Sequence, residues 1–284
     1  GGGFSLGADS STTAVNNNGK TYVAWNWKAN GGTTTTNDAS STGIGDRDSV
    51  YQANTTAGFS IVTYTGSGQT GAGNDDTYAH GLQVNGVATT PEVIICKNRQ
   101  TTDAWLFGAT AIPSFDWAND YMHFNDTIAH QTNANRSAFS VAPTSTVFSV
   151  GEFLNKTNNY VAYLFASVEG YSKFGSYTGN GNADGSFIYL GFRPAFIMSK
   201  KTSGTGNWEM FDTTRDPINY SGKYILANSS DQEGDTGTNT AGHIFDILSN
   251  GFKLRNTNSD RNSSGGTYIY MAFAEAPFKY ANAR

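Results

Sequence analysis

Four histidines and one cysteine are the residues of this chain whose types most often bind metals or act as nucleophiles. His80, His123, His130 and His243 are far apart, and none belongs to a zinc-type spacing such as H-E-x-x-H. Cys96 lies in an apolar run typical of a strand, so we expect a small packed side chain. A single cysteine also forms no disulfide within the chain. The sequence predicts no catalytic residue, no metal site and no cofactor.

Paired carboxylates could supply the acid and the base of a glycosidase. Glu152 with Glu169, or Asp103 with Asp212, are pairs of this kind. Carboxylates in a sheet protein more often lie in solvated loops, so we expect a protein that is not an enzyme. A glycan-cleaving enzyme is the alternative, and it would require two carboxylates about 5 to 10 Å apart in one groove.

Three short acidic loops contain the oxygen ligands that calcium prefers. They are Asp46-Arg47-Asp48, Asn74-Asp75-Asp76 and Asn182-Ala183-Asp184-Gly185. None completes the D-x-[DN]-x-[DN]-G pattern of a calcium loop. Turn residues that hydrogen-bond to their own backbone are the simpler interpretation.

Aromatic residues offer another function, because exposed aromatic faces can stack on sugar rings while carboxylates bind the hydroxyls. Residues 113–120 differ strongly from their counterparts at 216–223, and functional residues should lie where related segments differ. The candidate surface-binding residues are therefore Phe115, Asp116, Trp117 and Tyr220. Trp105 and Trp208, which are equivalent in the repeat described below, are expected in the core, as are Tyr121 and Tyr224.

The elements that must position these residues are strands. Apolar and polar residues alternate with a period of two, and several segments carry bulky residues on both faces. Turn signals such as Asn85-Gly86 and Asn250-Gly251 occur every eight to twelve residues, and they supply the positive φ of tight hairpins. We expect an all-β fold of tandem antiparallel β-sandwich modules, jelly-roll-like, with almost no helix.

Internal repeats define the organisation. A constant shift of 103 takes Pro91 to Pro194, Trp105 to Trp208 and Tyr121 to Tyr224. A closing unit of two strands occurs three times, in residues 3–25, 147–166 and 251–274. We therefore expect a module at 58–168 and a second at 169–284 that ends in a C-terminal tail. Residues 1–29 are expected to be the closing half of an upstream module, and 30–57 a polar linker.

Two tryptophans, Trp25 and Trp27, occupy alternate positions of the closing strand in residues 1–29. Alternate side chains of a strand lie on the same face. We expect this pair to form either the edge of a core or a contact between modules.

Charge and hydropathy exclude several classes of partner. The net charge is −5, and the 18 basic residues form no cluster denser than Lys200-Lys201, so nucleic-acid binding is not expected. No apolar run approaches the ~20 residues that cross a bilayer, so membrane insertion is not expected. The acidic balance also favours a neutral glycan or a protein receptor over a phosphate-rich surface.

Several strings of this sequence resemble repeated modules in virion structural proteins of marine bacteriophages, including cyanophages. They lie at residues 58–68, 80–82, 91–99, 168–177 and 268–282. The resemblance implies a non-enzymatic virion protein, located on the particle surface as a tail fibre or comparable appendage for host attachment. A head-surface decoration or head fibre that binds the capsid is the alternative, and a cell-surface adhesin or filament subunit is a further class.

The same resemblance implies the partners. They are other virion proteins, a host glycan or protein receptor, and further copies of the chain in a homo-oligomer such as a trimer. Weak sites that are repeated in an oligomer gain avidity.

Overall fold

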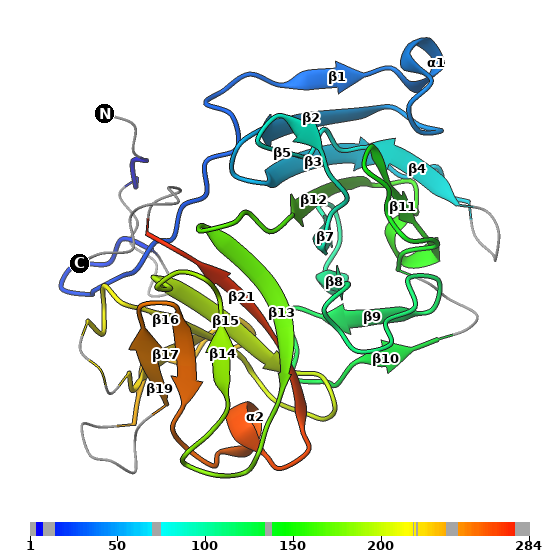
Figure 1. The fold of residues 1–284 in the computed structure, drawn as a ribbon. Coiled ribbons are helices and arrows are strands. Elements are labelled where there is room, and N and C mark those ends of the chain that lie inside the picture. Colours follow the sequence, from blue (N-terminus) through cyan, green and yellow to red (C-terminus); the bar gives the residue numbers. More distant parts are fainter. Residues whose placement is uncertain are drawn as a thin grey trace.

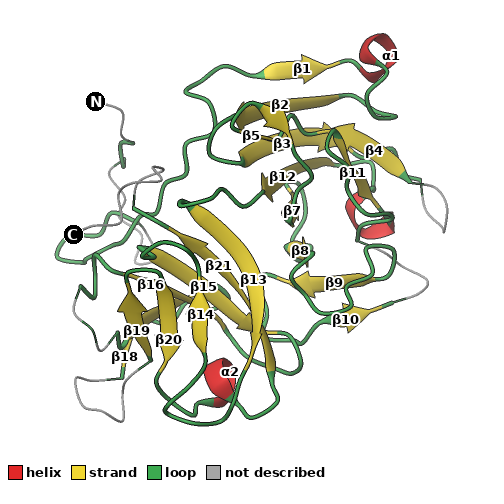
Figure 2. Cartoon of the chain, in the orientation of Figure 1, coloured by secondary structure: helices red, strands yellow, loops and turns green. Residues whose placement is uncertain are grey.

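The fold is known from a computed structural model, which describes residues 4–7, 15–69, 75–133, 138–217, 219, 221–236 and 244–275 of the 284. Antiparallel strands dominate these residues (Figure 2). The helices described are α1 (Ala39–Thr42), α2 (Ser259–Asn262) and the short 3₁₀ helix η1 (Glu152–Leu154). The expected all-β, sandwich-like fold is confirmed.

The first repeat contains one large sheet and one small sheet (Figure 1). The large sheet has the order β1-β2-β3-β12-β7-β8-β9-β10, and all its pairs are antiparallel. Its strands are β1 (Thr35–Asn37), β2 (Ser49–Asn54), β3 (Phe59–Thr65), β7 (Val93–Asn98), β8 (Leu106–Ala109), β9 (Asp120–His123), β10 (Gln131–Thr132) and β12 (Asn159–Phe165). The small sheet pairs β4 (Asp76–Ala79) with β11 (Val147–Val150), and β5 (Gln83–Val84) forms a hairpin with β6 (Val87–Ala88).

The second repeat has the same plan. Its large sheet has the order β13-β21-β15-β16-β17-β18, and its small sheet has the order β14-β20-β19. The large sheet contains β13 (Ser172–Thr178), β15 (Phe196–Lys201), β16 (Trp208–Asp212), β17 (Lys223–Leu226), β18 (Gly234–Asp235) and β21 (Thr267–Phe273). The small sheet contains β14 (Phe187–Tyr189), β19 (Phe245–Leu248) and β20 (Gly251–Leu254).

Three hydrophobic cores join these sheets. The first core includes residues of the large sheet of the first repeat and of β4 and β11. The second core includes residues of the large sheet of the second repeat and of β14, β19 and β20. Between them is a shared core, to which both large sheets contribute. Because each large sheet is covered on both faces, the described residues form four sheet layers with three cores between them.

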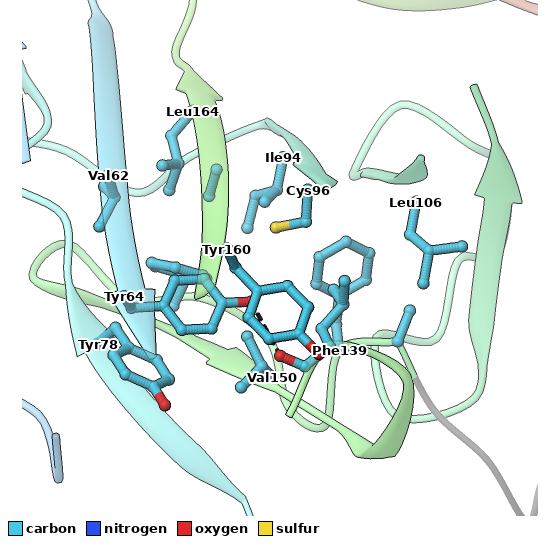
Figure 3. Packing of buried hydrophobic residues seen from close by; sticks show 14 of the residues in the cluster. Val62, Tyr64, Tyr78, Ile94, Cys96, Leu106, Phe139, Val150, Tyr160 and Leu164 are labelled. Carbon is cyan, nitrogen blue, oxygen red and sulfur yellow. Dashed lines mark hydrogen bonds between the residues drawn. The ribbon is translucent and has the colours of Figure 1, made fainter. Parts of the chain in front are cut away.

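Alternation along β12 explains how one sheet serves two cores. Tyr160 and Leu164 belong to the first core, whereas Phe165 belongs to the shared core and Tyr163 packs against it. In the first core the ring of Tyr160 stacks at 5.0 Å on that of Tyr64, its partner in the register with β3 (Figure 3). Bulky residues on both faces of a strand thus have a packing role, as the sequence indicated.

The expectation that residues 30–57 form a polar linker is wrong, because this range contains two strands and a helix. Within it, β2 pairs with β3 along six residues, β1 extends the sheet, and α1 follows with Asp38 as its N-cap. Strand β1 is the edge of the large sheet and β2 is its neighbour, and polar side chains are acceptable there because they bond to nearby backbone. Ser49 donates to the Ala79 oxygen at 2.9 Å, and Asn37 donates to Ile44 at 2.9 Å. Low apolar content marked an edge rather than a linker.

The described part of residues 1–29 also differs from expectation, since residues 4–7 and 15–29 form no strand. Residues 23–29 nevertheless alternate in burial, with Trp25, Trp27 and Ala29 on the inner side. These side chains pack against the shared core, so the two tryptophans do share a face and contact the modules. Figure 1 shows this N-terminal segment passing beside the second repeat before it reaches β1.

Candidate functional site

The loop at residues 113–120, which differs strongly between the repeats, turns the side chain of Trp117 inward. Trp117, expected on the surface, is only 7% exposed and belongs to the first core. Its ring meets Phe139 edge to face at 5.2 Å. Gly108 makes this possible, because a Cβ there would come within 2.8 Å of Trp117 and 2.6 Å of Phe139. The expectation of a surface-binding Trp117 is wrong.

Of the other three candidate binding residues, the structure describes Phe115 and Asp116. Phe115 is half-buried and meets Trp117 edge to face at 5.0 Å. Asp116 is exposed, but its carboxylate accepts hydrogen bonds from the Ala118 backbone at 3.0 Å and the Asn119 side chain at 2.7 Å, as a turn residue does. Tyr220 lies outside the described residues. Sequence difference located a variable loop but did not show which way its side chains point.

The framework expectation is confirmed for Trp208, which is buried in the shared core. Trp105 is half-buried and stacks on Tyr163 at 6.3 Å. Tyr121 and Tyr224 are half-buried and pack against the first and second cores. Equivalent aromatics therefore serve packing.

His80, His123 and His130 lie in the described part of the chain and belong to no group of metal ligands. In the ranges the structure describes, no group of three or more His, Cys, Asp or Glu side chains could hold a metal ion. His80 is buried, donates from Nε2 to the Thr144 oxygen at 3.2 Å and accepts from the Leu82 N–H at 2.9 Å. Burial lowers the pKa of His80 to about 4. His243 lies outside the described residues.

The acidic loops are occupied by protein partners. Asp76 accepts from Arg47 at 2.9 Å, from Asn155 at 2.8 Å and from Ser67. Burial opposes ionisation of Asp76, but these hydrogen bonds lower its pKa below the usual value. Asp184 pairs with Lys253 at 2.7 Å. Asn74 lies outside the described residues.

Two carboxylates of the glycosidase alternative also have basic partners. Asp103 Oδ2 lies 3.0 Å from Lys156 Nζ, and Asp212 Oδ2 lies 2.6 Å from Arg215 Nε. A serine-hydrolase pattern, G-x-S-x-G, occurs at residues 3–7. That pattern requires a sharp turn between a strand and a helix, whereas residues 4–7 are exposed and belong to neither.

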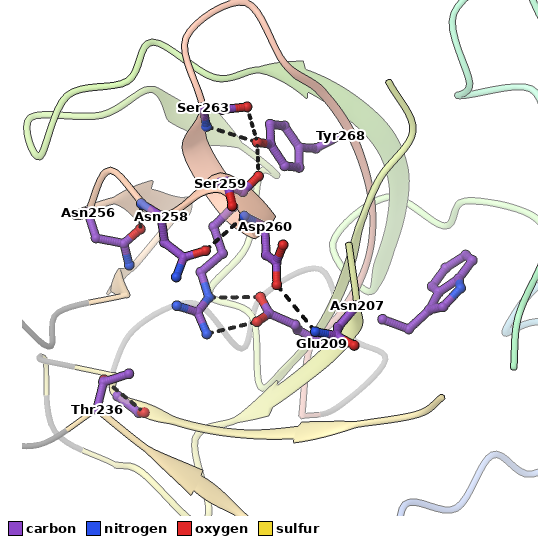
Figure 4. Close-up of polar contacts among 12 residues, drawn as sticks. Asn207, Glu209, Thr236, Asn256, Asn258, Ser259, Asp260, Ser263 and Tyr268 are labelled. Atoms are coloured by element: carbon purple, nitrogen blue, oxygen red, sulfur yellow. Dashed lines mark hydrogen bonds and ion pairs between the residues drawn. The ribbon is translucent and has the colours of Figure 1, made fainter. Parts of the chain in front are cut away.

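The most buried ion pair among the described residues joins Glu209 and Arg261 beside Tyr224, which packs against the second core (Figure 4). Arg261 donates to both oxygens of Glu209 at 2.8 Å, and its guanidinium lies 4.8 Å above the ring of Tyr224. Burial raises the pKa of Glu209. By the repeat, Glu209 corresponds to Leu106. Arg261 corresponds to Leu154. The backbone oxygen of each accepts a hydrogen bond from a tyrosine hydroxyl, Tyr177 for Arg261 and Tyr64 for Leu154. The pair occupies two leucine positions and is structural.

One pocket lies where the two repeats join. We call it the junction pocket; its volume is about 600 Å³. It is lined by Glu92, Ser167, Glu169, Gly170, Ser172, Lys173, Phe174, Tyr189, Leu190 and Gly191. Residues up to 167 come from the first repeat, and the connecting turn and β13 supply the next ones. The end of β14 completes the wall.

The junction pocket combines an aromatic ring with groups of both charges. Tyr189 is 58% exposed, and Lys173 Nζ lies 5.4 Å from its ring centre. Lys173 also donates to the Tyr189 oxygen at 2.9 Å, which holds the ammonium at the rim. Each carboxylate oxygen of Glu92 accepts a hydrogen bond of 2.8 Å, one from the backbone and one from the hydroxyl of Ser167. These contacts orient donors and acceptors around a ring.

Sequence reasoning missed Lys173 and Tyr189, although a signal was present. In Phe187-Ile188-Tyr189 the middle residue is buried, so period-two alternation puts both aromatics on the outer face. Phe187 and Tyr189 are both exposed. Exposed aromatics on a short strand therefore marked the wall of the pocket.

This fold and pocket define an all-β protein of two antiparallel repeats around a shared core, with a ligand-sized pocket at their junction. The chain belongs to the family described as Domain of unknown function (DUF7483), which matches residues 1–277. Searches of curated proteins and of solved structures find no match to this chain. Among the described residues, no helix is long and apolar enough to cross a membrane.

Proposed function

We propose that the chain is a non-enzymatic structural component of a bacteriophage virion, a tail fibre or comparable surface appendage that attaches the particle to its host. The observation that carries this proposal is the shared core. Equivalent faces of the two repeats are buried against each other, so that the two repeats form one body with a common core. The resemblance of the sequence to repeated modules of phage virion proteins supports the same role.

Most of the side chains that could take part in catalysis instead stabilise the fold, which also supports a non-enzymatic role. Glu209 and Arg261 fill leucine positions, Asp76 ties three segments together, and His80 bonds two backbone groups. Nothing among these side chains brings a nucleophile next to a base. A protein of this kind displays surfaces rather than converts substrates.

The junction pocket is the part of the surface best suited to host attachment. The face of the Tyr189 ring carries a partial negative charge and attracts the polarised C–H groups of a sugar ring. Carboxylates at Glu92 and Glu169 accept from hydroxyls, while Lys173 donates. With a net charge of −5 on the chain, a neutral glycan is the receptor class that we propose. Other virion proteins and further copies of the chain are the remaining proposed partners.

Electron microscopy of particles labelled with antibody against this chain tests the location. Label on the tail or its fibres is the expected result. Label on the head lattice would instead favour the capsid-binding alternative, and label on cell-surface filaments without particles would overturn a virion role altogether.

A binding experiment tests the pocket. Purified chain should bind neutral glycans on an array without creating new reducing ends, and Tyr189→Ala should weaken that binding at least tenfold. Val87→Ala, at an exposed position of β6, is the matched control and should bind as the unchanged chain does. Equal binding by Tyr189→Ala would remove the junction pocket from the proposal, and release of sugar would contradict a non-enzymatic role.

A further inference from the structure

A second pocket lies on the large sheet of the first repeat. We call it the edge pocket; its volume is about 540 Å³. The polar side chains that line it are those of Arg47, Asp48, Thr63, Thr65, Arg99 and Asn159. It shares no lining residue with the junction pocket, so the two pockets are separate sites.

The register of three neighbouring strands explains which side chains reach the edge pocket. On β3, Thr63 and Thr65 flank Tyr64, whose side chain belongs to the first core, so both threonines lie on the opposite face of the sheet. The Thr65 hydroxyl donates to Asn159 Oδ1 at 2.9 Å. The Arg99 N–H donates to the Asn159 backbone oxygen at 2.8 Å. Thr65, Asn159 and Arg99 therefore follow one another across β3, β12 and the end of β7.

Arg47 enters the edge pocket from the segment between α1 and β2. Its Nε lies 2.9 Å from Asp76 Oδ1, and its side chain is still 43% exposed. The Arg47 N–H donates to the Thr77 oxygen at 3.2 Å, which ties this segment to β4. Because the ion pair uses Nε, the guanidinium is held in place while its two terminal nitrogens remain for a ligand.

Positive charge prevails in the edge pocket. Arg99 is exposed, and within the part of the chain that the structure describes no carboxylate pairs with its guanidinium. Asp48 is the one carboxylate among the described lining residues, and its Oδ1 accepts the Ala39 N–H at 2.9 Å. Two guanidinium groups beside one carboxylate favour an anionic ligand.

The second repeat closes the equivalent place. By the repeat, Arg99 corresponds to Thr202 and Asn159 to Thr267. The two threonine hydroxyls lie 2.7 Å apart, and Thr202 is only 4% exposed. The Thr202 oxygen accepts the N–H of His130, from the first repeat, at 3.1 Å. The first repeat therefore covers this place in the second, whereas its own counterpart is open and carries an arginine.

We propose that the edge pocket binds the anionic group of an acidic sugar, a carboxylate or a sulfate. The planar fork of a guanidinium donates two parallel hydrogen bonds to such a group. The hydroxyls of Thr63 and Thr65, the Asn159 amide and the Asp48 carboxylate are partners for the hydroxyls of the sugar. This inference goes beyond the proposed function, and it stands whether or not the junction pocket binds a neutral glycan.

Isothermal titration calorimetry of the purified chain with trigalacturonate tests the inference. The trisaccharide should bind, and its methyl ester, which has the same rings without the charge, should bind at least tenfold more weakly. Sulfated trigalactose and its unsulfated form make the second arm, and binding of either anionic sugar identifies the group that the pocket takes. The affinity should fall as the salt concentration rises. Absence of binding by both anionic sugars, or equal binding by their uncharged forms, would refute the inference.

Variants assign the binding to the edge pocket. Arg99→Gln should weaken it at least tenfold, and Arg99→Lys, which keeps the charge but not the planar fork, should weaken it less. Arg193→Gln removes the same charge at an exposed position outside the pocket, so it is the matched control and should bind as the unchanged chain does. Thermal unfolding verifies that each variant is folded.

A variant of the other pocket keeps the two sites distinct. Tyr189→Ala should bind the anionic sugar as the unchanged chain does, even where it no longer binds neutral glycans. Equal losses in Arg99→Gln and Arg193→Gln would show a general effect of charge, and a loss confined to Tyr189→Ala would move the anionic sugar to the junction pocket. Either result would contradict a site at Arg99.

Discussion

At the scale of single residues, His80 links stability to pH. Its folded pKa of about 4 lies below the ordinary value of 6.5, so protonation favours the unfolded chain. The contribution is complete above pH 6.5 and is lost as the pH falls toward 4, with a total of the order of 3 kcal/mol. We expect the free energy of unfolding to fall in this window, measured by denaturant titration at each pH.

The matched variant for this prediction is His80→Gln, which keeps a donor and an acceptor but does not titrate. It should have a flatter pH profile between 4 and 6.5 than the unchanged chain. Identical slopes would show that carboxylates, not His80, produce the acid sensitivity.

Trp208 is the residue whose loss should be felt most in the shared core. It is 1% exposed, its ring lies 4.8 Å from Phe107 and 4.9 Å from Phe124, and it donates to the His123 oxygen at 2.8 Å. Trp208→Ala should cost about 3–5 kcal/mol of unfolding free energy. Trp208→Phe should cost less, and an unchanged denaturation midpoint for the alanine variant would contradict the assigned packing.

At the scale of elements, paired positions on neighbouring strands differ between the two repeats in side-chain volume and charge, while the fold is the same. Val62 faces Ala162 across β3 and β12, whereas the equivalent pair in the second repeat is Gly175 and Tyr270. A Cβ on Gly175 would collide with the Tyr270 ring, so the glycine accommodates the larger partner. Packing is conserved as a sum over two strands rather than at each residue.

The Glu209–Arg261 pair gives a prediction at the same scale. Arg261→Leu alone leaves a buried carboxylate without its partner and should cost about 3–5 kcal/mol. Glu209→Leu with Arg261→Leu restores the leucine pair found in the first repeat, so the double variant should be as stable as the unchanged chain or more so, by about 1–4 kcal/mol. Thermal and denaturant unfolding of the single variant, the double variant and the unchanged chain measure this. A double variant less stable than Arg261→Leu would contradict the equivalence of the positions.

At the scale of the whole molecule, Lys200 joins the two repeats. It is fully buried, and its Nζ donates to the oxygens of Thr127 at 3.3 Å, Ile128 at 2.9 Å and Lys201 at 2.9 Å. Burial lowers the pKa of Lys200 from 10.5 to about 8. The folded state therefore binds the proton less readily than the unfolded state, and the stability contributed by this group is lost as the pH falls through 8.

The lowered pKa of Lys200 predicts how the free energy of unfolding changes with pH. Between pH 8 and 9.5 the unchanged chain should gain stability relative to Lys200→Met, which lacks the titrating group. Their difference is the appropriate measure, because buried tyrosines with raised pKa values, such as Tyr270 at about 12, act in the opposite direction near pH 10. A difference that stays constant with pH would show that Lys200 does not titrate in this range.

The fold class was largely predictable from the sequence, because period-two alternation and glycine turns depend on neighbours along the chain. Bulky residues on both faces, as at Tyr163 and Leu164, indicated sheets covered on both sides, and the structure confirms this. Strands β1 and β2, at one end of the large sheet, were missed because they contain few apolar residues. Trp117 was misplaced because the sequence shows that a loop is variable but not that Gly108 leaves space beneath it.

By itself, the sequence determined most strands of the two repeats and the identity of equivalent positions, because these are local patterns and comparisons along one chain. Only the tertiary structure decided that equivalent faces meet in a shared core, and that Trp27, Phe165 and Phe273 come to one place. It alone also brought Glu92, Lys173 and Tyr189 around one pocket. The physical reason is that such contacts depend on which buried faces lower the exposed apolar area together, a property of the packed sheets rather than of any segment.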